Sequence, residues 1–296
     1  MLRIKNSNIL FMGEKVLPYL SFIGNEDFTL KTYNTTKNWD GTLEYSTDAI
    51  TWSTWDGTEI SSSGKSLYLR GTGNQRITGN SANYRFVFTG TNALNIACKG
   101  NIDNLLDYEA VSAGEHPIML SNCYNSMFRG CTSLTTAPAL PATTLEYGCY
   151  NSMFRDCTSL TTAPELPATE LAGYCYYCMF YNCTSLTMAP ELHATSLAFS
   201  GCYGYMFGGC TSLTTVPELP MTSLYKSCYQ GMFSGCSLIK LSTTQTGEYQ
   251  TAYRIPTSGT GTTDTDSLTN MFKGTGGTFS GTPEINTTYY TSNTVV

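Results

Sequence analysis

A segment of 26 residues repeats five times in the second half of this chain, and this period constrains the fold more than any other feature. The dipeptide Cys-Tyr begins at positions 123, 149, 175, 202 and 228, at steps of 26, 26, 27 and 26 residues. Each copy continues to a Met-Phe pair and to a second Cys eight residues after the first. Self-similarity at a period of about 20 to 50 residues is typical of stacked units that cannot bury a core alone. The sequence therefore predicts a solenoid over residues 119–241.

Two segments of different character alternate within each unit. The stretch Thr-Thr-Ala-Pro-x-Leu, as in residues 161–166, is short and interrupted by Pro, so it favours an extended segment at one edge. The stretch Cys-Tyr-x-x-Met-Phe-x-x-Cys, as in residues 149–157, spaces its apolar residues in a way that predicts one or two helical turns on the opposite side. Leu, Met, Phe and Cys would then point inward, as in a leucine-rich repeat.

These residues resemble a known family of repeats. Met-Phe-x-x-Cys-x-x-Leu followed by a Leu-Pro step is similar to the BspA-like and related MF-type leucine-rich repeats of bacterial surface proteins, and similar repeats occur in phage-encoded proteins. The resemblance covers Cys123 to about Leu241, with a longer period, an additional Cys-Tyr pair and an Ala-Pro step. It implies a role in surface adhesion and recognition and no enzymatic activity.

Residues 23–100 carry the pattern of aromatic and β-branched residues that is typical of antiparallel strands. We expect strands at residues 28–33, 42–45, 50–52, 66–70 and 84–88. Asp-Gly pairs at residues 40–41 and 56–57 indicate turns. The pattern predicts a β-sandwich-like domain with Trp39, Trp52 and Trp55 in its core. A glycan-stacking role for one of these indoles is the alternative.

The remaining segments frame these two parts. Residues 1–22 are a possible attachment segment, and residues 101–118 are a linker or cap with a short helix at 101–108. Residues 242–296 are expected to hold a degenerate repeat, in which Thr275 replaces the second Cys, followed by a C-terminal cap or strand-like tail. The predicted fold is therefore mainly β with short helices. It comprises the β-sandwich-like domain, a leucine-rich-repeat-like solenoid of five 26-residue units, and a degenerate terminal unit.

The twelve cysteines are explained by the repeat, because ten of them recur at its two Cys positions. We expect two interior ladders of reduced thiols that act as small hydrophobic groups. A helical segment would separate the two Cys of one unit too far for a disulfide, whereas bridges between successive turns stay open. Cys178 makes a lone C-x-x-C with Cys175, which is too little for a zinc or redox site.

Residues that would carry catalysis are sparse. The chain has two histidines, and neither His116 nor His193 has the partner spacing of a nucleophile triad or a metal motif. His193 replaces the Pro of the other units and is interpreted as a tolerated substitution. The sequence therefore predicts no catalytic residues, no cofactor and no metal.

Two rows of residues are candidate binding sites. The first is acidic and consists of Glu165, Glu191 and Glu218. Stacked carboxylates repel one another and must be solvated, counter-charged or cation-bound, and a solvated row is the simpler interpretation. The second is the single aromatic residue between the last Leu of a unit and the next Cys, which is Tyr147, Tyr174, Phe199 or Tyr225. Variable neighbours make this row a predicted recognition surface, with packing between turns as the alternative.

Charge and hydropathy limit the partners. Sixteen Lys and Arg against 22 Asp and Glu give a net charge of −6, which disfavours nucleic acid as a partner. The chain has no apolar run near the roughly 20 residues of a spanning helix, so we expect no membrane insertion. The apolar stretch at residues 9–12 is too short for a secretory signal, and we expect no export signal.

These observations favour a non-enzymatic component of a phage or prophage virion, such as a fibre, tail or head-decoration protein. It would assemble in the host cytoplasm in several copies or as a homo-oligomer. Its N-terminal region would contact other virion proteins, and its repeats would contact a host-surface glycan or protein. A bacterial cell-surface adhesin is the alternative, and no motif supports an enzyme.

Overall fold

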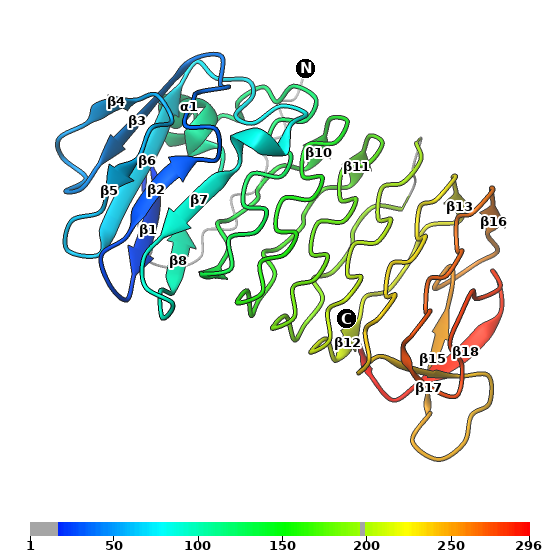
Figure 1. Cartoon of the computed structure of the whole chain (residues 1–296). Coiled ribbons are helices and arrows are strands. Elements are labelled where there is room, and N and C mark those ends of the chain that lie inside the picture. Colours follow the sequence, from blue (N-terminus) through cyan, green and yellow to red (C-terminus); the bar gives the residue numbers. More distant parts are fainter. Residues whose placement is uncertain (1–16, 196–198) are drawn as a thin grey trace, which may run out of the picture.

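The computed structural model describes residues 17–195 and 199–296, and over these residues the chain is mainly β. Figure 1 shows three parts in succession, with strands at one end, a row of similar coils in the middle and further strands at the other end. The described residues contain one α-helix, α1 (Asn104–Ser112), and one short 3-10 helix, η1 (Ala82–Tyr84). The prediction of a mainly β chain is confirmed.

Two sheets form the N-terminal part. The first, with six strands, has the order β4 (Ser53–Trp55), β3 (Thr42–Ser46), β6 (Ser66–Thr72), β1 (Leu20–Gly24), β8 (Ile96–Lys99) and β9 (Leu134–Thr136). The second, with three strands, has the order β5 (Ile60–Ser61), β2 (Thr29–Thr32) and β7 (Phe86–Thr89). All neighbouring strands are antiparallel except the pair β8 and β9.

Aromatic side chains join the two sheets. Strand β6 alternates buried and half-buried residues, so one of its faces points into the core. Phe22 of β1 lies 5.3 Å from Phe88 of β7, measured between ring centroids, and Trp55 of β4 lies 5.5 Å from Phe86 of β7. Such pairs add to the apolar area that each ring buries. The two sheets therefore share one core.

Three details differ from the sequence prediction. Trp52 is half-buried instead of lying in the core, because the Arg70 guanidinium covers its ring at 4.1 Å. No strand forms at residues 50–52, since Asp48 accepts the backbone N–H groups of the residues that follow it and holds a turn there. Helix α1 begins later than expected, at Asn104, because the Asn101 side chain accepts from the Asp103 N–H group.

The first repeat continues the N-terminal core without a break. Its strand β9 pairs in parallel with β8. The ring of Phe128 in the first repeat lies 5.8 Å from Phe86 and 6.4 Å from Phe22. The N-terminal sheets therefore cover the end of the repeats that would otherwise expose apolar side chains.

Equivalent aromatic side chains stack through the repeats. The phenylalanine column has centroid distances of 5.4 to 5.8 Å and interplanar angles of 2° to 12°, and it consists of Phe128, Phe154, Phe180, Phe207, Phe233 and Phe272. The tyrosine column has distances of 5.6 to 6.1 Å and consists of Tyr124, Tyr150, Tyr176, Tyr203 and Tyr229. All these rings except Phe272 come from the predicted 26-residue period, and Phe272 belongs to the predicted degenerate repeat.

The segment between the two Cys of a unit is a series of turns, so the prediction of helical turns is wrong. Its backbone N–H groups alternate between two kinds of partner. Met153 donates to Tyr150 within the unit, and Phe154 donates to Met179 of the next unit. A residue with positive φ follows every four positions, as at Gly148, Ser152 and Asp156. These left-handed residues break the helix, and the hydrogen bonds to the next unit replace the bonds that a helix would make.

The opposite side of each unit is extended, as predicted. Isolated parallel bridges join Thr136 to Thr162 and Thr162 to Met188. Short parallel strands join other points of the stack, namely β10 (Thr144–Leu145) to β11 (Glu170–Leu171), and β13 (Ser223–Leu224) to β16 (Thr262–Thr263). The prolines lie between these short pairs, because Pro has no N–H group for a ladder.

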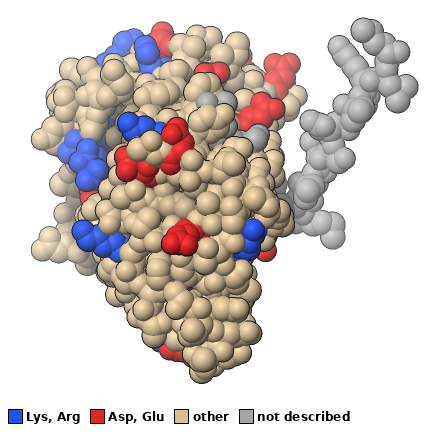
Figure 2. Space-filling view, turned by 90° about the vertical axis from the view of Figure 1, so that its right-hand side faces the viewer, with Lys and Arg blue, Asp and Glu red and all other residues tan. Residues whose placement is uncertain are grey.

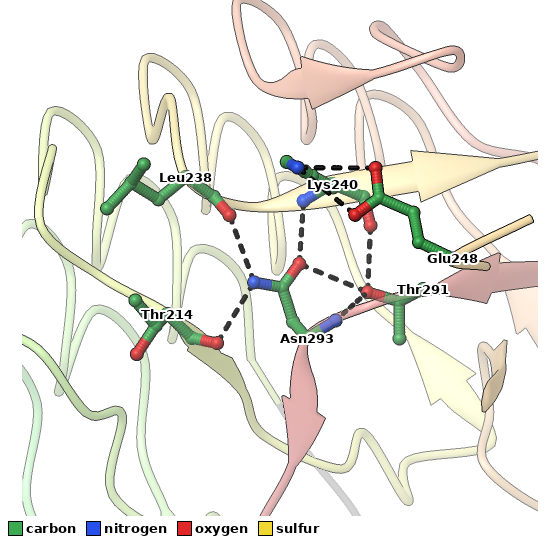
Figure 3. A network of polar contacts seen from close by, with 6 residues as sticks. All are labelled: Thr214, Leu238, Lys240, Glu248, Thr291 and Asn293. Carbon is green, nitrogen blue, oxygen red and sulfur yellow. Dashed lines mark hydrogen bonds and ion pairs between the residues drawn. The ribbon is translucent and has the colours of Figure 1, made fainter. Parts of the chain in front are cut away.

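The chain beyond the fifth repeat closes the stack. Its strands are β14 (Lys240–Ser242), β15 (Thr251–Arg254), β17 (Gly276–Gly277), β18 (Thr288–Thr291) and β19 (Thr294–Val295), of which β19 pairs with β12 (Thr215–Val216) of the fourth repeat. The Asn293 side chain donates to the Thr214 and Leu238 carbonyls and accepts from the Lys240 N–H group (Figure 3). One amide thus joins two repeats to the C-terminal tail.

Candidate binding surface

Tyrosines of one repeat lie against glycines of the next on the turn side of the stack. The pairs are Tyr174 with Gly201, Tyr177 with Gly204, Tyr181 with Gly208 and Tyr205 with Gly231. A methyl group on any of these glycines would come within 2.9 Å of the neighbouring ring, closer than real side chains approach. Because glycine has no side chain, these positions leave the space that the tyrosine rings occupy.

Four of the tyrosines contact one another in a continuous series. Ring centroids are separated by 5.7 Å between Tyr147 and Tyr174, by 5.5 Å between Tyr174 and Tyr177, and by 6.1 Å between Tyr177 and Tyr205. Tyr147 is 48% exposed and the other three are half-buried. We term Tyr147, Tyr174, Tyr177 and Tyr205 the tyrosine surface. It crosses the second, third and fourth repeats.

The predicted aromatic row is brought together only in part. Tyr147 and Tyr174 are in contact, and a methyl group on Gly173 would meet both the Cβ atom of Phe199, at 3.3 Å, and the Tyr147 ring, at 3.4 Å. Tyr225 lies apart, in a hollow of about 360 Å³ beside Asp264. The four residues do not share one position of the repeat, because Tyr147 lies two residues before the first Cys, Tyr174 one residue before it, and Phe199 and Tyr225 three residues before it.

Two members of the tyrosine surface were missed in the sequence. Tyr177 and Tyr205 lie between the Cys-Tyr and Met-Phe pairs, in positions where other repeats have Asn, Ser, Gln, Gly or Cys. The signal was a glycine one repeat later, at Gly204 for Tyr177 and at Gly231 for Tyr205. A tyrosine that is followed one repeat later by a glycine indicates a ring that packs against the glycine of the next repeat.

Charged side chains border this surface. The Arg155 guanidinium lies 4.8 Å from the centre of the Tyr181 ring. Asp156 has Arg155 at 3.4 Å and Arg129 at 3.9 Å, and its carboxylate accepts from the Asn182 amide at 3.0 Å. Half-exposed ion pairs of this kind add little to stability. These contacts keep the charged side chains of Arg129, Arg155 and Asp156 together, beside the tyrosines.

The acidic row is also brought together in part. Glu165 and Glu191 line one hollow of about 340 Å³ together with His193, whose Nε2 atom lies 4.0 Å from the Glu191 carboxylate. Glu218 lies outside this hollow, and its backbone N–H group donates to the C-terminal residue Val296 at 2.7 Å. All three glutamates are exposed, as the solvated interpretation predicts.

A second hollow, of about 290 Å³, lies at the junction of the N-terminal sheets and the repeats. It is lined by Asp103, His116 and Glu146 among others. The Tyr124 hydroxyl donates to the buried Asp103 carboxylate at 3.2 Å. Burial raises the pKa of Asp103 to about 6, against the opposing effects of the Tyr124 hydrogen bond and of His116. This carboxyl therefore titrates close to neutral pH.

All twelve cysteines are free and buried, as predicted for small hydrophobic groups. In the second ladder four thiols donate to the phenylalanine carbonyl of the preceding repeat, for example Cys157 to Phe128 at 3.0 Å, and the first, Cys131, donates to the Phe86 carbonyl of β7 at 3.3 Å. Burial raises the pKa of Cys131 to about 12 and that of Cys178 to about 11. Because the thiolate is the reactive form, these groups are poor nucleophiles.

Among residues 17–195 and 199–296, no group of three or more His, Cys, Asp and Glu side chains is arranged to hold a metal ion. No helix in this part of the chain combines the length and the apolar character needed to cross a membrane. On the face drawn in Figure 2 the charges are scattered and Lys and Arg form no continuous area.

No protein-family model, curated protein or solved structure matches this chain. A function therefore has to be argued from the geometry and chemistry of the surfaces described above.

Proposed function

We propose that this protein is a non-enzymatic structural and binding protein built on a leucine-rich-repeat-like solenoid. A β-sandwich-like domain at residues 23–100 and a linker at 101–118 would precede the solenoid at 119–241, and a cap at 242–296 would end it. The observation that carries the proposal is that backbone N–H groups of each repeat donate to carbonyls of the next, and that phenylalanines of successive repeats stack in one column. Stacking of this kind produces a long side surface, which repeat proteins use for binding.

The chemistry of the described side chains supports a binding role over catalysis. Covalent catalysis needs a nucleophile within hydrogen-bond reach of a base. The cysteines are buried with raised pKa values, and His193 has an exposed glutamate as its ionic partner. The candidate recognition residues are instead exposed or half-buried aromatics and carboxylates, namely Tyr147, Tyr174, Phe199, Tyr225, Glu165, Glu191 and Glu218.

Within this class we propose a component of a phage or prophage virion that displays its repeats to a host-surface glycan or protein. Two observations support it. The repeats resemble those of phage-encoded as well as bacterial surface proteins, and the twelve free thiols suit assembly in a reducing cytoplasm. The N-terminal region would bind other virion proteins. Residues 1–16 of this proposed attachment segment lie outside the described residues.

A bacterial cell-surface adhesin is the second candidate. The repeat resemblance favours it, because the BspA-like repeats belong to surface proteins. An adhesin would use the same side surface for recognition, so the tyrosine surface does not separate the two candidates. What separates them is the place where the protein is found.

The test is to locate the protein in purified particles and on washed cells that carry its gene. Quantitative mass spectrometry and immunogold labelling would be applied to both samples. We expect the protein in particles at a fixed ratio to the major structural proteins. Protein on washed cells and none in particles would reject the virion proposal in favour of the adhesin. Turnover by the purified chain of the glycan that it binds would reject the non-enzymatic role.

A further inference from the structure

Three positions of each repeat hold Tyr174, Tyr177 and Tyr205 and their counterparts in the other repeats, whereas Tyr147 lies two residues before the first Cys. Backbone hydrogen bonds between repeats bring these positions together; for example, the Ser152 N–H group donates to the Tyr177 carbonyl. In chain order, the residue before the first Cys is Asn122, Gly148, Tyr174, Gly201 or Ser227. The second residue after this Cys is Asn125, Asn151, Tyr177, Gly204 or Gln230. The third is Ser126, Ser152, Cys178, Tyr205 or Gly231.

None of these fifteen residues carries a charge, in a chain with 38 charged side chains. They are almost entirely Tyr, Ser, Gly, Asn and Gln, the residue types of protein loops that are specialised for recognition. Tyrosine provides a large rigid contact area at low cost in conformational entropy, and Ser and Asn provide adaptable hydrogen bonds. Seven of the fifteen are buried, and the eight that are half-buried are all Tyr, Asn, Ser or Gln, which indicates a binding surface for an uncharged ligand.

The side chains of this face are held in place before any ligand arrives. The rings of Tyr177 and Tyr205 lie against Gly204 and Gly231, which restricts their rotation. The Ser152 hydroxyl donates to the Asn151 amide oxygen at 2.9 Å and so orients that amide. Ordering these groups in advance lowers the entropy cost of binding.

We propose that the tyrosine surface binds a neutral glycan chain that runs along the stack of repeats. The inference rests on the proposed binding role and specifies its ligand. A pyranose ring presents C–H groups on its faces, which suit the apolar faces of tyrosine, and hydroxyls at its edge, which suit amides and phenols. The contacts between Tyr147, Tyr174, Tyr177 and Tyr205 cross three repeats, so they match successive sugar units better than one small molecule.

A charged glycan fits this surface less well. Sulfated or sialylated sugars are bound through Arg and Lys, which make strong hydrogen bonds to anionic oxygens. The nearest arginine at the edge of this face, Arg155, is already engaged with Asp156 at 3.4 Å and with the Tyr181 ring. The neutral rows and the net charge of −6 both disfavour an anionic ligand.

The first experiment is calorimetric titration of the full chain with neutral hexasaccharides of glucose, mannose and N-acetylglucosamine, alongside a sialylated oligosaccharide. We expect at least one neutral chain to bind and the sialylated one to bind no better. Tyr177→Ala and Tyr205→Ala should each weaken binding about tenfold, because each removes one aromatic contact. Tyr33→Ala, which removes a 53% exposed tyrosine from the N-terminal sheets, should leave binding unchanged.

A second variant keeps every tyrosine and moves one of them. Gly204→Ala puts a methyl group 2.9 Å from the Tyr177 ring and 3.1 Å from the Ser227 carbonyl, at a residue without positive φ, so the ring must shift and the carbonyl must give slightly. We expect about threefold to tenfold weaker glycan binding with an unchanged circular dichroism spectrum. Gly130→Ala, whose methyl group meets no atom within 4 Å but which strains its own backbone at a φ of 75°, controls for a general loss of stability and should bind normally.

Two results would overturn the inference. One is the absence of binding to all neutral oligosaccharides at millimolar concentration. The other is attachment of the protein to host cells that survives periodate oxidation of glycans and is abolished by protease, which would identify a protein partner. Neither result would contradict the virion proposal, because that proposal is tested by the presence of the chain in purified particles.

Discussion

The N-terminal sheets and the repeats bury similar residues in different ways. In the sheets each aromatic ring meets different partners, as Phe22 meets Phe86, Phe88 and Phe128. In the repeats one kind of contact recurs, as Phe180 lies between Phe154 and Phe207 at 5.7 and 5.8 Å. A contact in the sheets is therefore specific to one pair of sequence positions, whereas a contact in the repeats depends on the period.

The backbone shows the same difference. Strands β1 and β6 pair in an antiparallel ladder between segments that lie far apart in the chain. The repeats have few strands, and their turns donate backbone hydrogen bonds to the next unit, as in Phe128 to Met153 and Phe180 to Met206; from the fifth repeat to the terminal unit the partners lie further apart in the chain, as in Phe233 to Met271. A repeat thus interacts mainly with its nearest neighbours, the arrangement for which the stability of a repeat protein is approximately a sum of local terms. The sheets at one end and the tail at the other close the two ends of this series.

The largest expected effect comes from interrupting the phenylalanine column. Phe180→Ala removes both stacking partners of the ring and leaves a cavity, which should lower the free energy of unfolding by about 3–5 kcal/mol. All three tryptophans lie in the N-terminal sheets, at positions 39, 52 and 55, so their fluorescence reports on that part alone. Guanidinium unfolding should show the circular dichroism transition shifted to lower denaturant and the tryptophan transition shifted less.

Phe22→Ala is the matched control for this comparison. It removes a ring that contacts both the second sheet and the first repeat. Both transitions should therefore shift together. If Phe180→Ala also shifted both signals equally, the two regions would unfold as a single unit and the contrast between them would not hold.

The next effect lies at the junction of the two regions. The folded pKa of Asp103 is about 6 and its ordinary value is 3.8, so between about pH 4 and 6 the folded chain binds more protons than the unfolded chain. Stability should fall as pH rises through this window, by about 3 kcal/mol in total. Asp103→Asn removes the ionisation, and its amide oxygen can still accept from Tyr124, so this variant should lose the slope and be more stable at pH 7.

Denaturant midpoints at pH 4, 5, 6 and 7 would measure this effect. Glu115→Gln, which removes an exposed carboxylate close to His116 in sequence, is the control and should keep the slope of the parent chain. A slope that persists in Asp103→Asn would assign the titration to another group at this junction.

A smaller effect is expected from the left-handed turns. Gly130 and Gly209 occupy the same position of different repeats, each with a φ of 75°. Gly130→Ala should cost about 1 kcal/mol for the backbone conformation alone. Gly209→Ala should cost about 2 kcal/mol, because its methyl group also meets the Asn182 amide oxygen, which has to move. Thermal unfolding of both variants would show whether contact between repeats adds to the backbone term.

The smallest effect is expected in the reactivity of the thiols. With a chromogenic disulfide reagent at pH 8, the folded chain should show less than about one reactive thiol, because burial keeps the pKa values well above the pH. All twelve should react in denaturant. Cys98 of the sheets and the ten repeat cysteines should behave alike. Rapid reaction of Cys178 in the folded chain would mean that the repeats open locally at the tyrosine surface.

Part of this fold could be read from residue types at fixed spacing. Met153 and Phe154 were expected inside the stack because they recur with the period, and they lie there. Thr161 and Thr162 were expected on the extended edge, and Thr162 forms parallel bridges there. The interior position of the cysteines followed from the same period. Period and hydrophobicity are properties of the chain, so they can be recognised without coordinates.

Other features of the fold depend on contacts between residues whose proximity cannot be recognised from the sequence. The spacing of Tyr150, Phe154 and Cys157 is as compatible with a helix as with turns, and bonds to the next repeat decide for turns. Trp52 was expected in the core and is covered by Arg70, which comes from another strand. The role of Asn293 depends on carbonyls more than fifty residues away.

The sequence by itself determined the period, the residues of the interior and the largely uncharged character of the surface. Tertiary structure alone decided which exposed tyrosines meet, because Tyr147, Tyr174, Tyr177 and Tyr205 occupy different positions of their repeats. It also raised the pKa of Asp103, which depends on burial at the junction. The physical reason is that hydrophobic periodicity is encoded along the chain, whereas ring contacts and desolvation depend on distances between segments that only folding brings together.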